Sequence, residues 1–271
     1  MPLSPGYIHA PVLDWSTTPL ASDYHGCYVK ILDDFFTPEE CTKLISLAES
    51  EAKWEQAAVH YGLGPNQKYI DTNYRNSERI LRFDKEASER LYQKLLPYVQ
   101  EIVSIKPGGE WENIVGMSRG FADVEWNMVG LNERLSFLRY GPGNYFRQHC
   151  DGTLQLPDDR FSHVTVQIYL GDGRNAPSDS TESCDDSLGE TGMPGGSPSN
   201  ATLPLVGGPT RIWSRDGKKW LDVDAKLGRV LIFQQRQILH SGEDVKQGLK
   251  YALRTDIMFK RTLEGKAHRR E

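Results

Sequence analysis

The sequence of 271 residues contains few cysteines, and they are scattered along the chain. Its four cysteines, at positions 27, 41, 150 and 184, include no Cys-x-x-Cys pair and no spacing typical of a zinc site. A small secreted domain without a large core needs a dense set of disulfides, which this chain does not have. The sequence therefore disfavours both a disulfide scaffold and a structural zinc module.

The chain also lacks a large excess of either charge and any long apolar run. Its 32 Lys and Arg residues against 37 Asp and Glu residues give a formal net charge of −5, and basic residues cluster only at 266–271. This distribution gives no electrostatic footprint for nucleic acid. No segment approaches the roughly 18 apolar residues of a membrane helix, and the first residues do not resemble a signal peptide. We expect a cytoplasmic or nuclear protein with no nucleic-acid and no membrane partner.

Several catalytic motifs are missing as well. The sequence has no Gly-x-Ser-x-Gly turn, no Gly-x-x-x-x-Gly-Lys loop, no Gly-x-Gly-x-x-Gly after a strand and no His-Glu-x-x-His. These absences disfavour α/β-hydrolase, P-loop, dinucleotide-binding and zincin chemistry.

Two helices are predicted in the first half of the chain. Thr37 at a cap position, followed by Pro38 and two acidic residues, is typical of a helix start, and this helix should extend to about Lys53. A four-residue apolar period predicts a second helix over residues 85 to about 102. Pro97 lies inside it, and we expect a break or a kink there.

The second half of the chain has the pattern of an antiparallel β fold. From about residue 130, short strand-like segments are separated by Gly, Pro and Asp clusters, and no crossover helix follows any of them. This arrangement predicts a barrel or a double-sheet jelly roll. Residues 172–208 are dense in Ser, Gly, Pro and acidic residues, and we expect a mobile insert there. The strands predicted in the whole chain are Cys27–Leu32, Leu135–Tyr140, Tyr145–Cys150, His163–Leu170, Thr210–Trp213, Arg229–Phe233 and Lys250–Phe259.

Three residues are candidate metal ligands. His149 and Asp151 are two residues apart on a predicted strand, so both can face one ion while Cys150 faces away. A third ligand from another strand would complete the site, and His240 follows the predicted strand that begins near residue 229. Two imidazoles and one carboxylate, with open positions left, are the ligand set of non-haem Fe(II) sites that activate O2. The His-x-Asp pair alone is a weak signal, because so short a motif also occurs by chance.

Two basic residues on a later strand point to an anionic ligand. Lys250, Ala252 and Arg254 share one strand face. If this face is the inner one, two cations lie inside a small barrel, where an unpaired charge is costly. A dicarboxylate co-substrate that chelates iron at one end and meets a cation at the other would fit.

These segments resemble, in the same order, the prolyl 4-hydroxylase-like family of 2-oxoglutarate/Fe(II)-dependent dioxygenases. The likeness covers about residues 28 to 260. It implies an α+β fold, namely a double-stranded β-helix (a jelly-roll, cupin-like barrel) with supporting N-terminal helices. The segments that carry the resemblance are Asp33–Cys41, Arg139-Tyr-Gly-Pro-Gly, His149-Cys-Asp151-Gly, Gly207-Gly-Pro-Thr210 and His240-Ser-Gly through Lys250.

The resemblance also implies a division of the chain. A single dioxygenase domain should span residues 28–262, with helical support over 28–115 and the jelly-roll core over 116–262. An irregular segment, 1–27, should precede it, and a basic tail, 263–271, should follow.

The family's site roles can be carried over to this sequence. His149, Asp151 and His240 are implied as the iron ligands, and Lys250 as the cation that holds the far carboxylate of 2-oxoglutarate. Arg254 is the alternative for that carboxylate, since its fork could bind it bidentately, or it could contact the substrate instead.

Some further residues have two interpretations each. Tyr169 matches a position where the family often places a hydroxyl donor to 2-oxoglutarate, and Tyr140 fits a similar inward position. Tyr169 could equally be a core aromatic, and Tyr140 is expected to be a core aromatic, with the inward position as its alternative. Tyr74–Arg79 is expected to be a solvated loop, with a place at the rim of the active site as the alternative. His163 should be a structural hydrogen-bonding residue and no ligand.

The implied activity is hydroxylation of an unactivated C–H bond with Fe(II), 2-oxoglutarate and O2, which yields succinate and CO2, with ascorbate as an additional candidate cofactor. The substrate would be a peptide or protein residue, such as proline, or a small metabolite. A non-catalytic metal-binding jelly-roll module is the alternative from another functional class.

Overall fold

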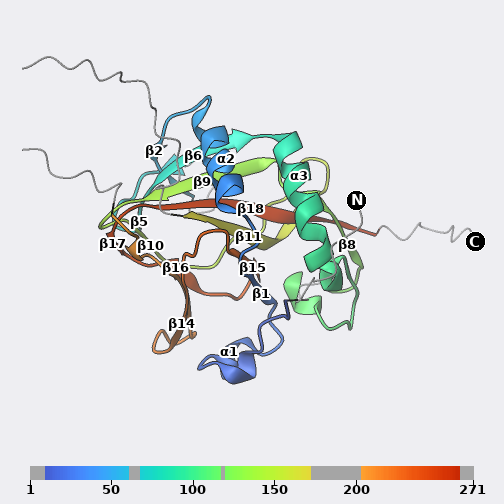
Figure 1. Ribbon diagram of the computed structural model, residues 1–271. Helices are drawn as coiled ribbons and strands as arrows, with labels where there is room; N and C mark the ends of the chain where they lie inside the picture. The colour runs from blue at the N-terminus through green and yellow to red at the C-terminus, as the bar shows by residue number, and fades with distance from the viewer. Residues whose placement is uncertain (1–9, 61–67, 117–119, 172–202, 263–271) are drawn as a thin grey trace, which may run out of the picture.

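Two antiparallel β-sheets dominate the structure (Figure 1). It is a computed structural model, and it describes residues 10–60, 68–116, 120–171 and 203–262. The sheets contain nine and five strands, which confirms the predicted α+β jelly-roll fold. The larger sheet has the order β1 (Val29–Leu32), β15 (Val230–Gln234), β11 (Phe161–Gly171), β18 (Lys250–Arg261), β9 (Arg134–Tyr140), β6 (Glu78–Phe83) and β2 (Glu55–Gln56), with β8 (Trp126–Leu131) paired to β18 and β7 (Ser104–Ile105) paired to β8. The smaller sheet has the order β14 (Trp220–Val223), β13 (Thr210–Trp213), β16 (His240–Gly242), β10 (Tyr145–His149) and β5 (Arg75–Asn76).

All seven predicted strands are present, and their ends differ from the prediction by at most two residues. β6 and β8 of the larger sheet and β14 and β16 of the smaller one were not predicted. In β6, Glu78, Arg79 and Arg82 are partly exposed and Phe83 is exposed, so the apolar alternation of a half-buried strand is concealed.

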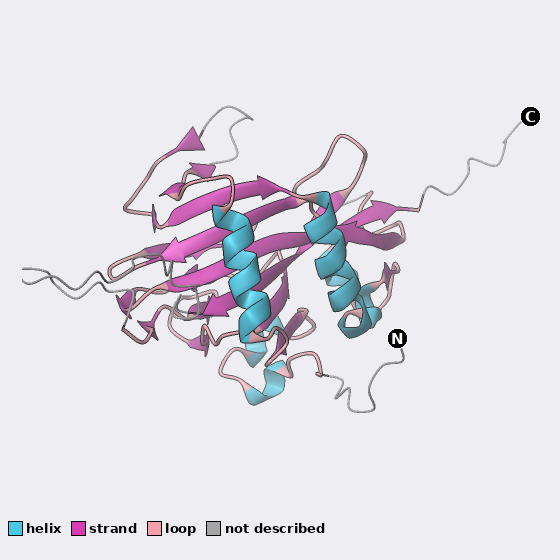
Figure 2. Ribbon diagram, turned by 45° about the horizontal axis from the view of Figure 1, so that its top comes forward, coloured by secondary structure: helices cyan, strands magenta, loops and turns pink. Residues whose placement is uncertain are grey.

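Two helices cover one face of the larger sheet (Figure 2). The first, α2 (Pro38–Glu49), begins with a capping box in which Thr37 and Glu40 each accept a hydrogen bond from the other's backbone N–H. It ends four residues before Lys53, because the side chains of Ser50 and Arg82 donate to the carbonyl of Leu47 and replace its helical partner.

The second helix, α3 (Lys85–Leu95), stops as predicted near Pro97. Two short 3-10 turns, Leu96–Tyr98 and Gln100–Ile102, continue the chain. Proline has no backbone N–H and its ring clashes with a preceding carbonyl, so the α-helical pattern cannot continue through it.

Strand alternation gives the larger sheet two different faces. On β18, Tyr251 and Leu253 join the hydrophobic cluster beneath the helices, whereas Ala252 joins the cluster between the two sheets. Lys250 and Arg254 lie on the same side as Ala252. The functional side chains therefore face the space between the sheets, and the helices stabilise the opposite face.

The remaining elements are short. Residues 10–27 were expected to be irregular, but they contain a 3-10 turn and a helical turn whose Trp15, Leu20 and Tyr24 are buried. Residues 203–208 of the expected insert include β12, which pairs with β17. The short elements are η1 (Trp15–Thr17), α1 (Ala21–Tyr24), β3 (Val59–His60), β4 (Lys68–Tyr69), η4 (Glu112–Ile114), β12 (Val206–Gly207) and β17 (Val245–Gln247).

Parts of three predicted segments lie outside the described residues: 1–9, 172–202 and the basic tail 263–271. Within the described ranges, none of the helices has the length and apolar character needed to cross a membrane.

Candidate iron site

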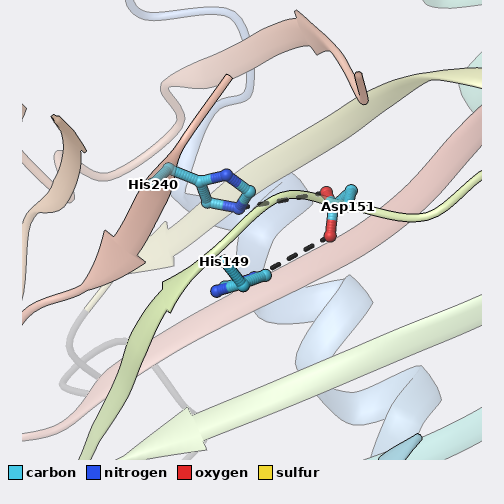
Figure 3. Close-up of side chains that lie close together, drawn as sticks. All are labelled: His149, Asp151 and His240. Carbon is cyan, nitrogen blue, oxygen red and sulfur yellow. Dashed lines mark ion pairs between the residues drawn. The ribbon is translucent and has the colours of Figure 1, made fainter. Parts of the chain in front are cut away.

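The three predicted metal ligands lie together (Figure 3). Their candidate ligand atoms, one from each of His149, Asp151 and His240, are all within 4.8 Å of one another. Oδ1 of Asp151 is 3.8 Å from Nε2 of His149, and Oδ2 of Asp151 is 3.9 Å from Nε2 of His240. The three side chains therefore surround a common point.

Strand pairing explains why the two imidazoles meet. His149 ends β10, and the antiparallel pairing with β16 sets it directly opposite His240. Side chains directly opposite each other in such a pair are in contact range, and the two ring centroids are 4.3 Å apart. Asp151 follows two residues after β10, and Thr165 on the larger sheet donates a 2.7 Å hydrogen bond to its Oδ2. The site thus joins the two sheets.

The hydrogen bonds of both rings leave Nε2 available as a ligand. Nδ1 of His149 is 2.7 Å from the carbonyl oxygen of Arg147, and Nδ1 of His240 is 3.0 Å from that of Ile238. A carbonyl only accepts, so each Nδ1 carries the proton and each Nε2 presents a lone pair. Burial lowers the pKa of His149 to about 3 and also lowers the pKa of His240. Both rings are therefore in the neutral form that binds metal ions.

Arg254 keeps Asp151 ionised. Its Nη2 is 3.1 Å from Oδ2 of Asp151 and 3.2 Å from Oδ1 of Asp256. Burial raises the pKa of Asp151, but the charge of Arg254 and the neighbouring imidazoles lower it by more, so the pKa lies well below its ordinary value. Burial lowers the pKa of Arg254, and the two carboxylates raise it by more. The charge of Arg254 is thus balanced inside the protein.

A cavity of about 260 Å³ opens at the three ligands and is lined by residues from both sheets. Asp151 is the only acidic residue in its lining, within the described part of the chain. Five basic residues line the same cavity, namely Arg75, Arg79, Arg134, Lys250 and Arg254.

Lys250 is buried in this cavity without an acidic partner. Its exposed fraction is 1%, and its Nζ donates a 2.6 Å hydrogen bond to the carbonyl of Gly208. Nζ lies 5.0 Å from the ring centre of Tyr140 and 5.8 Å from that of Tyr169. Among the described residues, no carboxylate lies within ion-pair distance of it. Burial lowers the pKa of Lys250 to about 8, and Glu243 opposes this effect only in part.

The turn Gly207–Thr210 lies against Lys250. Gly208 has a φ of +69°, and a Cβ there would lie 2.8 Å from Cγ2 of Val245, so only glycine fits this turn. The hydroxyl of Tyr169 donates to Oγ1 of Thr210 at 2.7 Å, and burial raises the pKa of Tyr169. The structure thus brings both predicted tyrosines, this turn and Lys250 together.

Three of the basic residues, Arg75, Arg79 and Arg134, had no predicted role or only a minor one. The expected solvated loop at Tyr74–Arg79 is wrong, because Arg75 lies on β5 with an exposed fraction of 8% and Arg79 lies on β6. Pairing of β5 with β10 and of β6 with β9 draws both arginines into the cavity wall. Arg134, at the start of β9, carried no motif that would have marked it.

His163 also differs from its prediction. It is fully buried and packs edge-on against Trp126, with ring centroids 4.7 Å apart. Within the described ranges, neither of its ring nitrogens has a hydrogen-bond partner. Burial lowers its pKa to about 3, so it is a neutral core residue and not a hydrogen-bonding one.

An antiparallel jelly roll with two imidazoles and one carboxylate at a basic cavity defines the class of non-haem iron oxygenases. Residues 135–255 match the family model of the 2OG-Fe(II) oxygenase superfamily. The jelly-roll segment of this chain is thus similar to that superfamily, and the similarity implies Fe(II), 2-oxoglutarate and O2 as cofactors. The matched segment contains all three candidate ligands and Lys250.

Prolyl hydroxylases are among the solved structures that resemble this one. A prolyl-4-hydroxylase from Pseudomonas putida is 16% identical, with a TM-score of 0.48, over 88% of this chain and 96% of that one. A viral collagen prolyl hydroxylase from Paramecium Bursaria Chlorella virus-1 is 19% identical, with a TM-score of 0.45, over 87% of this chain and 98% of that one. No curated protein sequence matches this chain. At these identities and TM-scores we infer nothing about the substrate.

Proposed function

We propose that this protein is a 2-oxoglutarate- and Fe(II)-dependent hydroxylase in which His149, Asp151 and His240 hold the iron. The observation that supports this most strongly is that two neutral Nε2 atoms and an ionised carboxylate meet at the wall of a cavity with a buried ammonium. This donor set fits Fe(II) and leaves coordination positions open. When bound together, Fe(II) and 2-oxoglutarate activate O2 to hydroxylate an unactivated C–H bond, with succinate and CO2 as the other products.

We assign Lys250 to the far carboxylate of 2-oxoglutarate. A buried ammonium without an acidic partner is costly unless an anion binds it. Arg254 suits this role less, because Asp151 and Asp256 already balance its charge. Arg254 acts instead as a positioning residue, which holds Asp151 ionised and oriented. Tyr140 would complete the subsite because it lines the cavity beside Lys250, and Tyr169 would support it through its hydrogen bond to Thr210.

The substrate class proposed from the sequence resemblance is a peptide or protein residue, such as proline, or a small metabolite. The single-domain division over 28–262, a cytoplasmic or nuclear location and a need for ascorbate stay predictions.

Anaerobic titration with Fe(II), followed by 2-oxoglutarate, tests the assignment. The wild-type protein should bind one equivalent of Fe(II) and develop a 2-oxoglutarate-dependent visible absorption band. His240→Ala should lose iron affinity by more than the roughly 100-fold that removal of an outer-shell partner costs. The matched control is His25→Ala, because His25 is exposed and lies outside the cavity lining. Unchanged iron binding in His240→Ala would remove this residue as a ligand.

Admission of O2 distinguishes an enzyme from a metal-binding module. The enzyme should release succinate from the coloured complex, and His240→Ala should not. Colour without any succinate would favour the non-catalytic module.

A further inference from the structure

Three arginines on the cavity wall have no acidic partner among the residues that the structure describes. Within the described ranges, no carboxylate lies within ion-pair distance of Arg75, Arg79 or Arg134. Arg75 is buried, donates to Oγ of Ser77 at 3.2 Å and lies over the ring of Phe146. Nε of Arg134 is buried without a hydrogen-bond partner in the described part of the chain. The charges of all three guanidinium groups are therefore available to an anion in the cavity, and Nε of Arg134 is available as a hydrogen-bond donor.

The strand register gathers this positive charge around one row of the larger sheet. Leu81 on β6, Ser136 on β9 and Arg254 on β18 are direct cross-strand neighbours. Arg79 lies two residues before Leu81, and Arg134 two residues before Ser136, on strands that run in opposite directions. The two arginines therefore flank the row from opposite sides and face the same cavity.

The proposed cofactors do not balance these charges. The positive charges of Fe(II), Lys250 and Arg254 are equal in number to the negative charges of 2-oxoglutarate, Asp151 and Asp256. The three arginines remain as a net positive excess. Burial, and then the charges of Arg75, Arg134 and Arg254, lower the pKa of Arg79 to about 10.

We infer that the substrate carries an oxyanionic group, a carboxylate or a phosphate, which Arg79 and Arg134 bind, with Arg75 adding positive charge from the smaller sheet. This inference rests on the proposed function, because it treats Lys250 as the 2-oxoglutarate residue. Guanidinium groups suit it because their planar forks bind carboxylate and phosphate oxygens bidentately. A cationic substrate would meet repulsion from three unbalanced charges in a partly desolvated cavity.

Anion titration of the loaded protein tests the inference without a known substrate. The wild-type protein, saturated anaerobically with Fe(II) and 2-oxoglutarate at low ionic strength, is titrated with inorganic phosphate and separately with N-acetylglutamate. At least one probe should bind with one-to-one stoichiometry, and the tighter of the two identifies the oxyanion. Binding should weaken at least about tenfold in the double variant Arg79→Gln/Arg134→Gln, since each lost charge-assisted hydrogen bond costs about that much.

Arg90→Gln is the matched control, because Arg90 is 67% exposed on α3 and pairs only with Glu86 among the described residues. It should leave the affinity unchanged. The inference is overturned if neither probe binds, if the double variant binds as tightly as the wild type, or if the double variant loses the 2-oxoglutarate absorption band. That last result would mean that the arginines hold the co-substrate. A wild-type protein that binds phosphate but shows no such band would reject the proposed function and leave the anion site standing.

Discussion

Two groups of charged side chains share the cavity and differ in how their charge is balanced. Around the iron ligands, Arg254 lies within 3.2 Å of both Asp151 and Asp256, and Thr165 donates to Asp151. Around Arg79 and Arg134, no carboxylate among the described residues lies within ion-pair distance. The first group therefore contains internal counter-charges before any ligand binds, and the second contains none among the described residues.

This difference in charge balance matches two functions, metal binding and anion recognition. A metal site needs its ligands ionised and oriented in advance, and an internal counter-charge does this at the cost of desolvating both partners. A site that recognises an anion must keep its cations unpaired, since an internal carboxylate would compete with the ligand. The balanced group therefore suits the metal, and the unbalanced one suits the substrate.

Removal of Arg254 should have the largest effect on this balance. Arg254→Met would leave two buried carboxylates unpaired, and the free energy of unfolding should fall by about 3–5 kcal/mol. The measurement is chemical denaturation of the metal-free protein, with iron affinity as a second readout, because a purely structural role would not weaken it. Arg90→Met should change stability by less than about 0.5 kcal/mol. Unchanged stability and iron affinity in Arg254→Met would show that Asp151 needs no counter-charge.

The assignment of Lys250 to 2-oxoglutarate can be tested through the pH dependence of the KM for 2-oxoglutarate. Its pKa of about 8 means that the ammonium is charged below that pH and is lost above it. The KM for 2-oxoglutarate should therefore be lowest below pH 8 and rise above it, by up to about tenfold per pH unit. Lys250→Arg should flatten this rise, because a guanidinium stays charged. A KM that is constant from pH 7 to 9.5 in the wild type would contradict the assignment.

A carboxylate introduced next to Arg79 and Arg134 should give these arginines an internal counter-charge like the one that Arg254 already has. Leu81 is 38% exposed, lines the cavity and shares a strand face with Arg79. Leu81→Glu should raise the free energy of unfolding by up to about 1 kcal/mol and weaken phosphate binding. Val129→Glu, at a position on β8 that is 41% exposed and outside the cavity lining, should do neither. Equal effects of the two variants would show that the arginines are not under electrostatic strain.

Much of the fold could be predicted because strand alternation is a local property. The strands that carry His149 and Lys250 were bounded within two residues, and the two-residue spacing of His149 and Asp151 already placed them on one side. The place of Arg79 in the cavity wall was predicted only as the alternative to a solvated loop, because β6 has too many charged residues to show an apolar period. Its inward position follows from pairing with β9, more than fifty residues later in the chain.

The choice between Lys250 and Arg254 also needed the structure. Both residues share a strand face, and the sequence resemblance favoured Lys250 but left Arg254 as an alternative. Only the fold brings Asp256 and Asp151 to one of them and the carbonyl of Gly208 to the other.

The order of residues alone predicted the antiparallel β fold, the helix caps and the His149–Asp151 pair, because strand alternation, caps and a two-residue spacing depend on neighbours a few positions away. The third candidate ligand, His240, was implied by the family resemblance. The tertiary structure decided which charges are balanced, because that depends on cross-strand neighbours from distant segments and on how far water is excluded around them. Charge balance is a property of the cavity as a whole, and no short stretch of the chain contains it.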